Sequence, residues 1–135
     1  MEPVMEFEGY SINKLFYGTI ESDIEIDESE DEDDNFERKV SIGISEDKKK
    51  GIVILNVILF NSDNQKSIDV EVAGEFSINK SLEIEEVEEL LTVNGVALIY
   101  PYVRSIISMI TSLDSSSAII IPTLNTKIFS NKEEE

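Results

Sequence analysis

The sequence predicts an α+β domain, in which a four-stranded antiparallel sheet is followed by two C-terminal helices packed on one of its faces. Three observations carry this prediction. Apolar residues alternate with polar ones, or run together, over four short stretches before residue 80, as in strands. Short polar turns separate the last three stretches, as in β-hairpins. After Ser81 the apolar spacing changes to three and four residues, which is the period of a helix.

Length and composition set the broad class. The 135 residues fit one domain, so we expect 1–135 to share a single core. A hydrophobic content of 41% is too high for a wholly disordered chain, although 30% of the residues are charged. The chain has no Cys, which agrees with a reducing compartment. Without a basic signal start or an apolar run approaching roughly 20 residues, we expect a cytoplasmic protein and no membrane insertion.

The charge balance is strongly acidic. Eleven basic residues stand against 29 acidic ones, which gives a formal charge of −18. Such a field repels nucleic acid phosphates and anionic lipid, so we predict that the protein binds neither. The same charge favours basic partners and keeps a protein soluble while apolar surface is exposed. Solubility alone accounts for much of it.

The first strand is expected to start at Phe16, or as early as Tyr10, with a bend near Gly18. Alternation puts one set of residues on its buried face: Phe16, Ile20, Ile24 and Ile26.

The residues after this strand are acidic. We predict that 27–35 form a flexible loop, because like charges repel and nothing apolar is available to bury. The spacing of the first ligand-type side chains is similar to a calcium loop. However, Glu32 stands where an EF-hand needs Gly, and Arg38 stands where it needs a bidentate Glu. We therefore expect no metal site.

The remaining strands are expected at residues 40–44, 52–60 and 68–78. The middle one is apolar almost throughout, broken only by Asn56, so both of its faces are expected to be covered. Such a strand is central in the sheet or lies in an oligomer interface.

The helices follow directly. Ser81 is expected to cap the first, whose early turns carry acids that the helix dipole favours. Asn94-Gly95 is expected to break it. The second has Pro101 near its start, where a missing N–H is tolerated, and runs to about Leu113. Its apolar stripe is wider than one sheet face requires.

Catalysis is not expected. The chain has neither His nor Cys, so the usual general base and the thiol nucleophile are absent. The Glu-rich first helix is most simply a solvated face. No phosphate-binding glycine loop appears either, and we predict no enzyme activity and no cofactor.

Apolar surface exceeds what one small core needs. The wide second helix, the third strand and the apolar segment Ala118–Leu124 each require cover. The simpler explanation is oligomerisation, and the sharper one is that some surface stays open to bind unfolded polypeptide.

Several motifs in order resemble the SecB family of export chaperones, over roughly residues 66–129. A strand ending in Gly74-Glu75-Phe76-Ser77-Ile78 precedes a short acidic helix, and the next helix starts with Tyr100-Pro101-Tyr102-Val103-Arg104. The later Ile121-Pro122-Thr123-Leu124-Asn125 is similar to that family's segment after its long helix.

This resemblance implies an ATP-independent holdase: a homotetramer built as a dimer of dimers through the long helices, with apolar grooves that hold unfolded polypeptide clients. The implied peptide-binding residues are Phe16, Ile20, Ile24, Phe76, Ile119, Ile121 and Leu124. For any one of the strand residues, burial in the core is the better interpretation. The implied oligomer interface consists of Tyr102, Val103, Ile106, Ile107 and Ile110.

Departures from the family weaken the export role. In export chaperones, acids on the exposed sheet face and a C-terminal tail engage the translocation motor SecA. Asp69 falls at one matching acidic position, but strand one offers no convincing acid, and 130–135 is only a short charged tail. Some SecB-like proteins instead protect an antitoxin. An antitoxin is therefore as well supported as SecA as the expected partner of this chain.

A second function of another class follows from charge alone. An acidic protein can act as a decoy that mimics nucleic acid and blocks a basic, nucleic-acid-binding partner. Salt separates the two functions, because exposed charge pairs are screened within about 10 Å at 0.1 M, whereas apolar binding persists.

Overall fold

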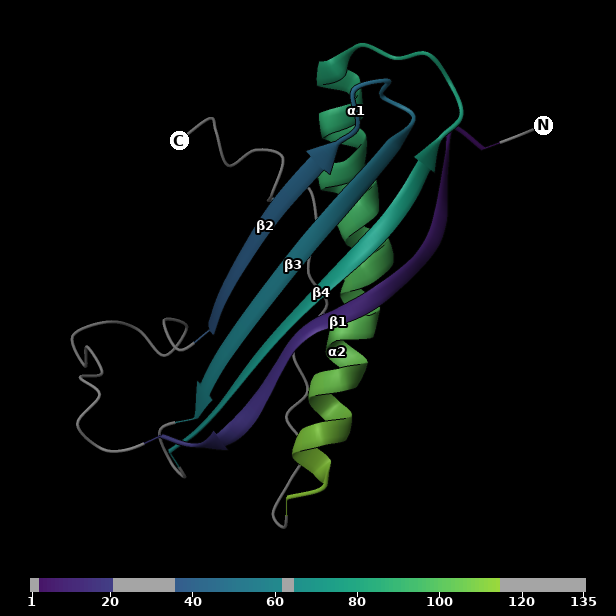
Figure 1. The fold of residues 1–135 in the computed structure, drawn as a ribbon. Helices are drawn as coiled ribbons and strands as arrows, with labels where there is room; N and C mark the ends of the chain where they lie inside the picture. The colour runs from purple at the N-terminus through teal and green to yellow at the C-terminus, as the bar shows by residue number, and fades with distance from the viewer. Residues whose placement is uncertain (1–2, 21–35, 62–64, 115–135) are drawn as a thin grey trace.

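The computed structural model describes residues 3–20, 36–61 and 65–114. It confirms the expected α+β class, with a four-stranded antiparallel sheet covered on one face by helix (Figure 1). The strands lie in the order β1-β4-β3-β2, so β1 and β2 are the edges of the sheet. Their bounds are Met5–Thr19 for β1, Phe36–Ile44 for β2, Lys50–Asn61 for β3 and Lys66–Ile78 for β4.

The helices form one continuous stretch. It comprises α1 (Ile84–Leu90), a π-helical turn η2 (Leu91–Gly95) and α2 (Val96–Ser112). The expected break at Asn94-Gly95 is therefore wrong. A Cβ added to Gly95 would lie 2.8 Å from Val53 Cγ2, so this glycine lets the helix approach β3 closely instead of ending it.

The start of this stretch also differs from the sequence prediction. Glu83, not Ser81, is the N-cap residue, and its N–H donates to the Glu86 carboxylate at 3.0 Å. The acidic side chain thus satisfies one of the N–H groups that a helix start leaves without a partner.

The whole stretch Ile84–Ser112 has 29 residues and is long and apolar enough to cross a membrane by length and composition. This differs from the expectation that no segment is. A core helix of a globular protein passes the same test, and this helix packs on the sheet through a buried face.

The core lies between the sheet and α2. β3 and β4 contribute alternate residues, and α2 contributes one per turn; all of them are fully buried. They include Val53, Leu55, Val57, Val70, Val72, Phe76, Ile99, Val103 and Ile107. Gly74 allows the closest approach, because a Cβ there would lie 2.5 Å from Ile99 Cγ2.

The register defines two faces of the sheet, which we call the helix side and the outer side. Strand β1 contains irregularities between Phe7 and Gly9 and between Ile12 and Lys14, and Gly9 has a φ of 145°. Each bulge shifts the alternation of side chains. As a result Phe16, opposite Asp69, lies on the outer side and is exposed, whereas Tyr17, opposite Ile68, lies on the helix side. The face predicted for Phe16 is therefore wrong.

The C-terminal end of α2 is fixed to the sheet. The Tyr17 hydroxyl donates to the Asp114 carboxylate at 2.8 Å, and Lys66 Nζ lies 3.2 Å from the same carboxylate. Tyr17 lies near the end of β1 and Lys66 begins β4, so Asp114 lies at the end of the sheet opposite the β2–β3 turn. Burial, followed by the hydrogen bond that the Tyr17 hydroxyl donates to Asp114, raises the pKa of Tyr17.

Candidate functional site

Exposed apolar side chains gather on the helix side of β1 and on the adjoining flank of α2. We define the β1–α2 patch as Tyr10, Ile12, Leu15, Tyr102, Met109 and Leu113, all of them exposed. Tyr10 and Tyr102 stack with ring centroids 4.4 Å apart, and this contact joins the strand to the helix. Met109 is 61% exposed and Leu113 is 78% exposed. An apolar surface of this kind marks an interaction site more often than a solvated face.

A second apolar surface lies along the helix side of β2. Helix α2 packs on β4, β3 and β1, whereas β2 contacts α1 and η2. The part of β2 beside α2 is therefore only partly covered. We define the β2 strip as Phe36, Val40, Ile42 and Ile44, which are half-buried against the core.

The outer edge of β2 is a regular one. Ser45 N–H donates to the Lys50 carbonyl at 2.9 Å, and hydrogen-bonded pairs alternate along an antiparallel ladder. The main-chain N–H and C=O groups of residues 37, 39, 41 and 43 therefore point towards β3. The same groups of Val40 and Ile42 point away from the sheet. Within the described residues β2 has no bulge and pairs only with β3. Such an edge can accept an extended peptide as a further strand.

The outer side of the sheet carries an apolar row and a row of acids. Strand β3 places Ile52, Ile54, Ile58 and Phe60 there, all half-buried. Strand β4 adds Asp69, Glu71 and Glu75.

Asp69 is already engaged within the chain. Its Oδ2 lies 2.7 Å from Lys14 Nζ, and its Oδ1 accepts a hydrogen bond from Asn56 Nδ2 at 2.8 Å. The hydrogen bond to Asp69 raises the pKa of Lys14. Only 16% of the Asp69 side chain is exposed, which leaves it poorly available as the partner-binding residue expected from the sequence.

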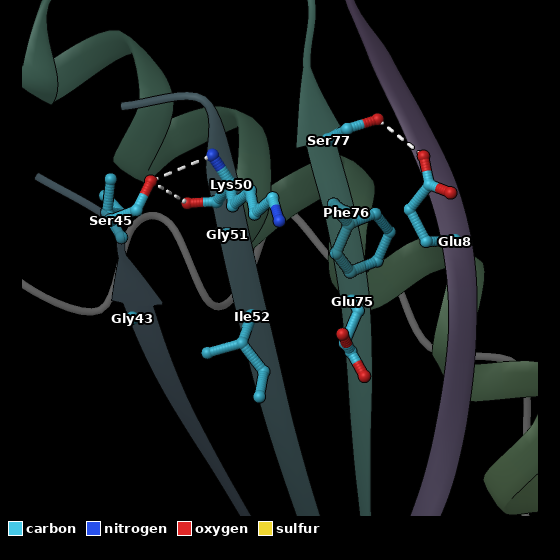
Figure 2. Close-up of a pocket in the computed structure, with 10 residues that line it drawn as sticks. Glu8, Gly43, Ser45, Lys50, Gly51, Ile52, Glu75, Phe76 and Ser77 are labelled. Atoms are coloured by element: carbon cyan, nitrogen blue, oxygen red, sulfur yellow. Dashed lines mark hydrogen bonds between the residues drawn. The ribbon is translucent and has the colours of Figure 1, made fainter. Parts of the chain in front are cut away.

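An open hollow of about 780 Å³ lies near the β2–β3 turn and is lined by Glu8, Ile52 and Glu75 among others. Figure 2 shows these residues. Its hydroxyls are held in structural hydrogen bonds. Ser77 donates to Glu8 at 2.6 Å, and Ser45 donates to Asp47 at 2.7 Å while accepting from the Lys50 N–H. The Ser45 hydroxyl, followed by the Lys49 N–H, lowers the pKa of Asp47.

No group of three acids suited to a metal ion occurs in the part of the chain that the structure describes.

The structure separates the expected peptide-binding residues. Phe16 is 47% exposed on the outer side, and Ile20 is half-buried just beyond β1. Phe76 is 1% exposed in the core, so its assignment to a peptide-binding surface is wrong for this chain. The other four lie outside the described residues: Ile24, Ile119, Ile121 and Leu124. The loop 27–35 and the tail 130–135 also lie outside them.

The expected oligomer interface divides in the same way. Val103 and Ile107 are fully buried against the sheet, so neither is available to a second chain. Tyr102 is exposed, and Ile106 and Ile110 are partly buried. Sequence reasoning missed Tyr10, Ile12 and Leu15. Their alternation was visible, but the two bulges of β1 decide which face each occupies.

A search of solved structures identifies the fold. A Mycobacterium tuberculosis protein, Rv1957, described as a SecB-like chaperone in complex with a ChAD peptide from the Rv1956 HigA1 antitoxin, matches with a TM-score of 0.68. The match covers 89% of this chain and 90% of that one at 14% identity. This chain has a SecB-like fold.

Two other proteins are similar to this chain. A Streptococcus agalactiae protein of unknown function matches with a TM-score of 0.60 and 14% identity, over 88% of this chain and 97% of that one. An uncharacterized Methanocaldococcus jannaschii protein, MJ0357, is 35% identical over 68 residues. That match spans 50% of this chain and 43% of MJ0357. No family model matches the sequence.

Proposed function

We propose that this SecB-like protein is an ATP-independent holdase that binds unfolded polypeptide in the cytoplasm. The observation that carries the proposal is the β2 strip beside a regular, outward-facing strand edge. Half-buried apolar side chains and main-chain groups that point away from β3 together suit an extended chain of almost any sequence. The similar fold of a chaperone that binds an antitoxin peptide supports a polypeptide client.

In this proposal a client lies along β2 as an added strand. Its main chain pairs with Val40 and Ile42, and alternate side chains contact the β2 strip. Each contact with the client is weak. Several contacts along one client chain and across several subunits together give a high overall affinity. Holding of this kind requires neither nucleotide nor catalysis.

The experiment removes one main-chain donor. Val40→Pro deletes an N–H that points away from β3, so the ladder inside the sheet stays intact. Val40→Thr is the control, because it keeps the N–H and nearly the same side-chain shape. We expect Val40→Pro to weaken binding of an unfolded client about fivefold to tenfold, since one lost hydrogen bond is worth about 1 kcal/mol. Equal client affinities for the two variants would contradict strand addition at β2.

We further propose that the β1–α2 patch is where copies of the chain assemble, toward a homotetramer built as a dimer of dimers. The patch combines six exposed apolar side chains with an aromatic stack, and it lies on the face of the sheet that carries α2. An antitoxin is the client class that the similar structure favours, and SecA is the alternative partner that the family resemblance offers. Internal pairing of Asp69 weakens the case for SecA.

The acidic-decoy function remains the second candidate, because of the charge of −18. The described acids on the outer side favour it only in part, since Asp69 is paired with Lys14.

A further inference from the structure

We infer that the β2 strip selects client segments in which an aspartate or glutamate lies among apolar residues, because Arg38 and Arg104 place two positive charges beside the strip. This inference rests on the proposed function and deepens it, since it names the class of client segment. Three observations carry it: the face of β2 on which Arg38 lies, the flank of α2 that carries Arg104, and a buried donor nitrogen that lacks an acceptor.

The first observation is that Arg38 lies on the same face as the β2 strip. Arg38 pairs with Val57, which is fully buried in the core, so it shares the helix side with Phe36 and Val40. Its guanidinium Cζ lies 5.3 Å from the centroid of the Phe36 ring, a contact that holds a cation against an aromatic face. The strip therefore carries a positive charge at its first residue.

The second observation is that Arg104 lies on the flank of α2 that is turned towards β2. Tyr102 marks the opposite flank, because its ring stacks on Tyr10 of β1 with the centroids 4.4 Å apart. Two residues correspond to a rotation of about 200° around a helix, so Arg104 lies on the side away from β1. Tyr100, one turn earlier, is buried. Burial raises the pKa of Tyr100, while the charges of Arg104 and then Arg38 act in the opposite direction. Both guanidinium groups thus act on one tyrosine hydroxyl beside the strip.

The third observation is a donor without an acceptor. Within the described residues, Nε of Arg104 is buried and makes no hydrogen bond. Leaving the buried donor of a charged group without an acceptor is costly, and a carboxylate that reaches it forms a short, charge-assisted hydrogen bond. A client can approach this residue, because Arg104 is half-buried and lines an open hollow of about 480 Å³ with Pro101 and Ser108 among others.

The charge beside the strip differs from that of the chain as a whole. The formal charge of −18 favours basic partners at a distance. However, the acids of α1 lie near the other end of β2, because a Cβ on Gly51 would meet Leu91, directly after α1, and Gly51 pairs with Ile44. Six residues of strand, roughly 20 Å, separate Ile44 from Arg38. This is about twice the screening distance at 0.1 M salt, so the two arginines dominate the field at the start of the strip.

The test uses the full chain and three peptides of nine residues, the length of β2. Each peptide is acetylated and amidated, so that only a side chain can supply a carboxylate. Val occupies the odd positions and Thr the even ones, except that the central residue is Glu, Gln or Lys. On an added strand the central residue then faces the strip together with its apolar neighbours. We expect the Glu peptide to bind about tenfold more tightly than the Gln peptide, the scale of one charge-assisted hydrogen bond, and the Lys peptide to bind most weakly.

Variants of the chain assign this preference to the two arginines. Arg38→Gln and Arg104→Gln each remove one charge beside the strip, and Lys39→Gln is the matched control. Lys39 pairs with Asn56, so it is exposed on the outer side. We expect each arginine variant to reduce the Glu-to-Gln affinity ratio to about threefold or less and the control to leave it near tenfold. Arg104→Lys keeps the charge without the planar fork and should keep part of the ratio. Damage to the fold weakens both peptides alike and leaves the ratio unchanged.

Binding of the Gln peptide reports the holdase, and the ratio reports the inference. Equal Kd values for the Glu and Gln peptides, or tightest binding of the Lys peptide, would overturn the inference while leaving the holdase intact. A ratio that falls as far in Lys39→Gln as in the arginine variants would also overturn it, since the field of the whole chain would then be responsible. If the wild type binds none of the three peptides, the proposed function fails and the inference fails with it.

Discussion

At the scale of single residues, neighbouring side chains on α2 have opposite roles. Ile107 is fully buried on the sheet, whereas Met109, two residues later, is 61% exposed. Sequence spacing alone gave a wide apolar stripe on this helix. Only the crossing of α2 over β4, β3 and β1 decides which part of the stripe forms the core.

Ile107→Ala should therefore destabilise each folded chain instead of dividing an oligomer. Removing a buried isoleucine costs about 2–5 kcal/mol, because it loses apolar burial and leaves a cavity. Met109→Ala is the control and should change the free energy of unfolding by less than about 0.5 kcal/mol. Urea denaturation measures both. A stable Ile107→Ala monomer would contradict the placement of this side chain.

At the scale of elements, the strands and the helices were predictable to different degrees. The hairpins β2–β3 and β3–β4 follow from alternation and polar turns, and the structure places them as expected. Strand β1 was harder, because two bulges shift its register and invert the face of Phe16. The helix break at Asn94-Gly95 failed because Gly95 serves tight packing on Val53, which no local pattern reveals.

The hydrogen bond between Tyr17 and Asp114, which fixes the end of α2 to the sheet, also belongs to the scale of elements. We call it the α2–sheet joint. Tyr17→Phe removes the hydroxyl that donates to Asp114 and should cost about 1 kcal/mol, the typical net value of one hydrogen bond. Tyr10→Phe is the control, since its ring stacks on Tyr102 and no hydrogen bond involves its hydroxyl within the described residues. Thermal denaturation of the two variants measures the difference. Equal melting temperatures would show that the joint contributes nothing.

This joint has a defined pH dependence. The pKa of Tyr17 is raised above its ordinary value of 10 by burial and by the bond to Asp114. The stabilisation of the folded protein by neutral Tyr17 is therefore fully present below pH 10. It is lost as the pH rises through the pKa that Tyr17 has in the folded protein. Tyr17→Phe should lack this alkaline component of the stability curve.

At the scale of the whole molecule, the sequence predicted that apolar surface would remain, but not where. Its location depends on which strands α2 leaves uncovered, and this is a property of the strand order β1-β4-β3-β2. The order itself depends on β1 pairing with β4, a contact between residues that lie from 47 (Thr19 and Lys66) to 73 (Met5 and Ile78) positions apart. Periodicity within one strand cannot specify such a pairing.

Assembly is tested at this scale. Met109→Asp places a charge within the β1–α2 patch without disturbing the core, because Met109 is exposed. We expect it to reduce the mass measured by light scattering, since an unpaired carboxylate buried at an interface costs several kcal/mol. Ser45→Asp, at the turn on the opposite edge of the sheet, is the control and should leave the mass unchanged. A wild-type monomer would contradict the assembly proposal.

The measurement that tests the central claim most directly is client affinity across a salt series. The proposed holdase binds an unfolded polypeptide mainly through apolar contacts and main-chain pairing. Its Kd for a reduced, alkylated polypeptide should therefore persist or improve between 0.05 M and about 0.5 M salt, as exposed charges become screened within a few ångströms. Binding that collapses over this range, or binding only to folded basic proteins, would contradict the holdase and favour the acidic decoy.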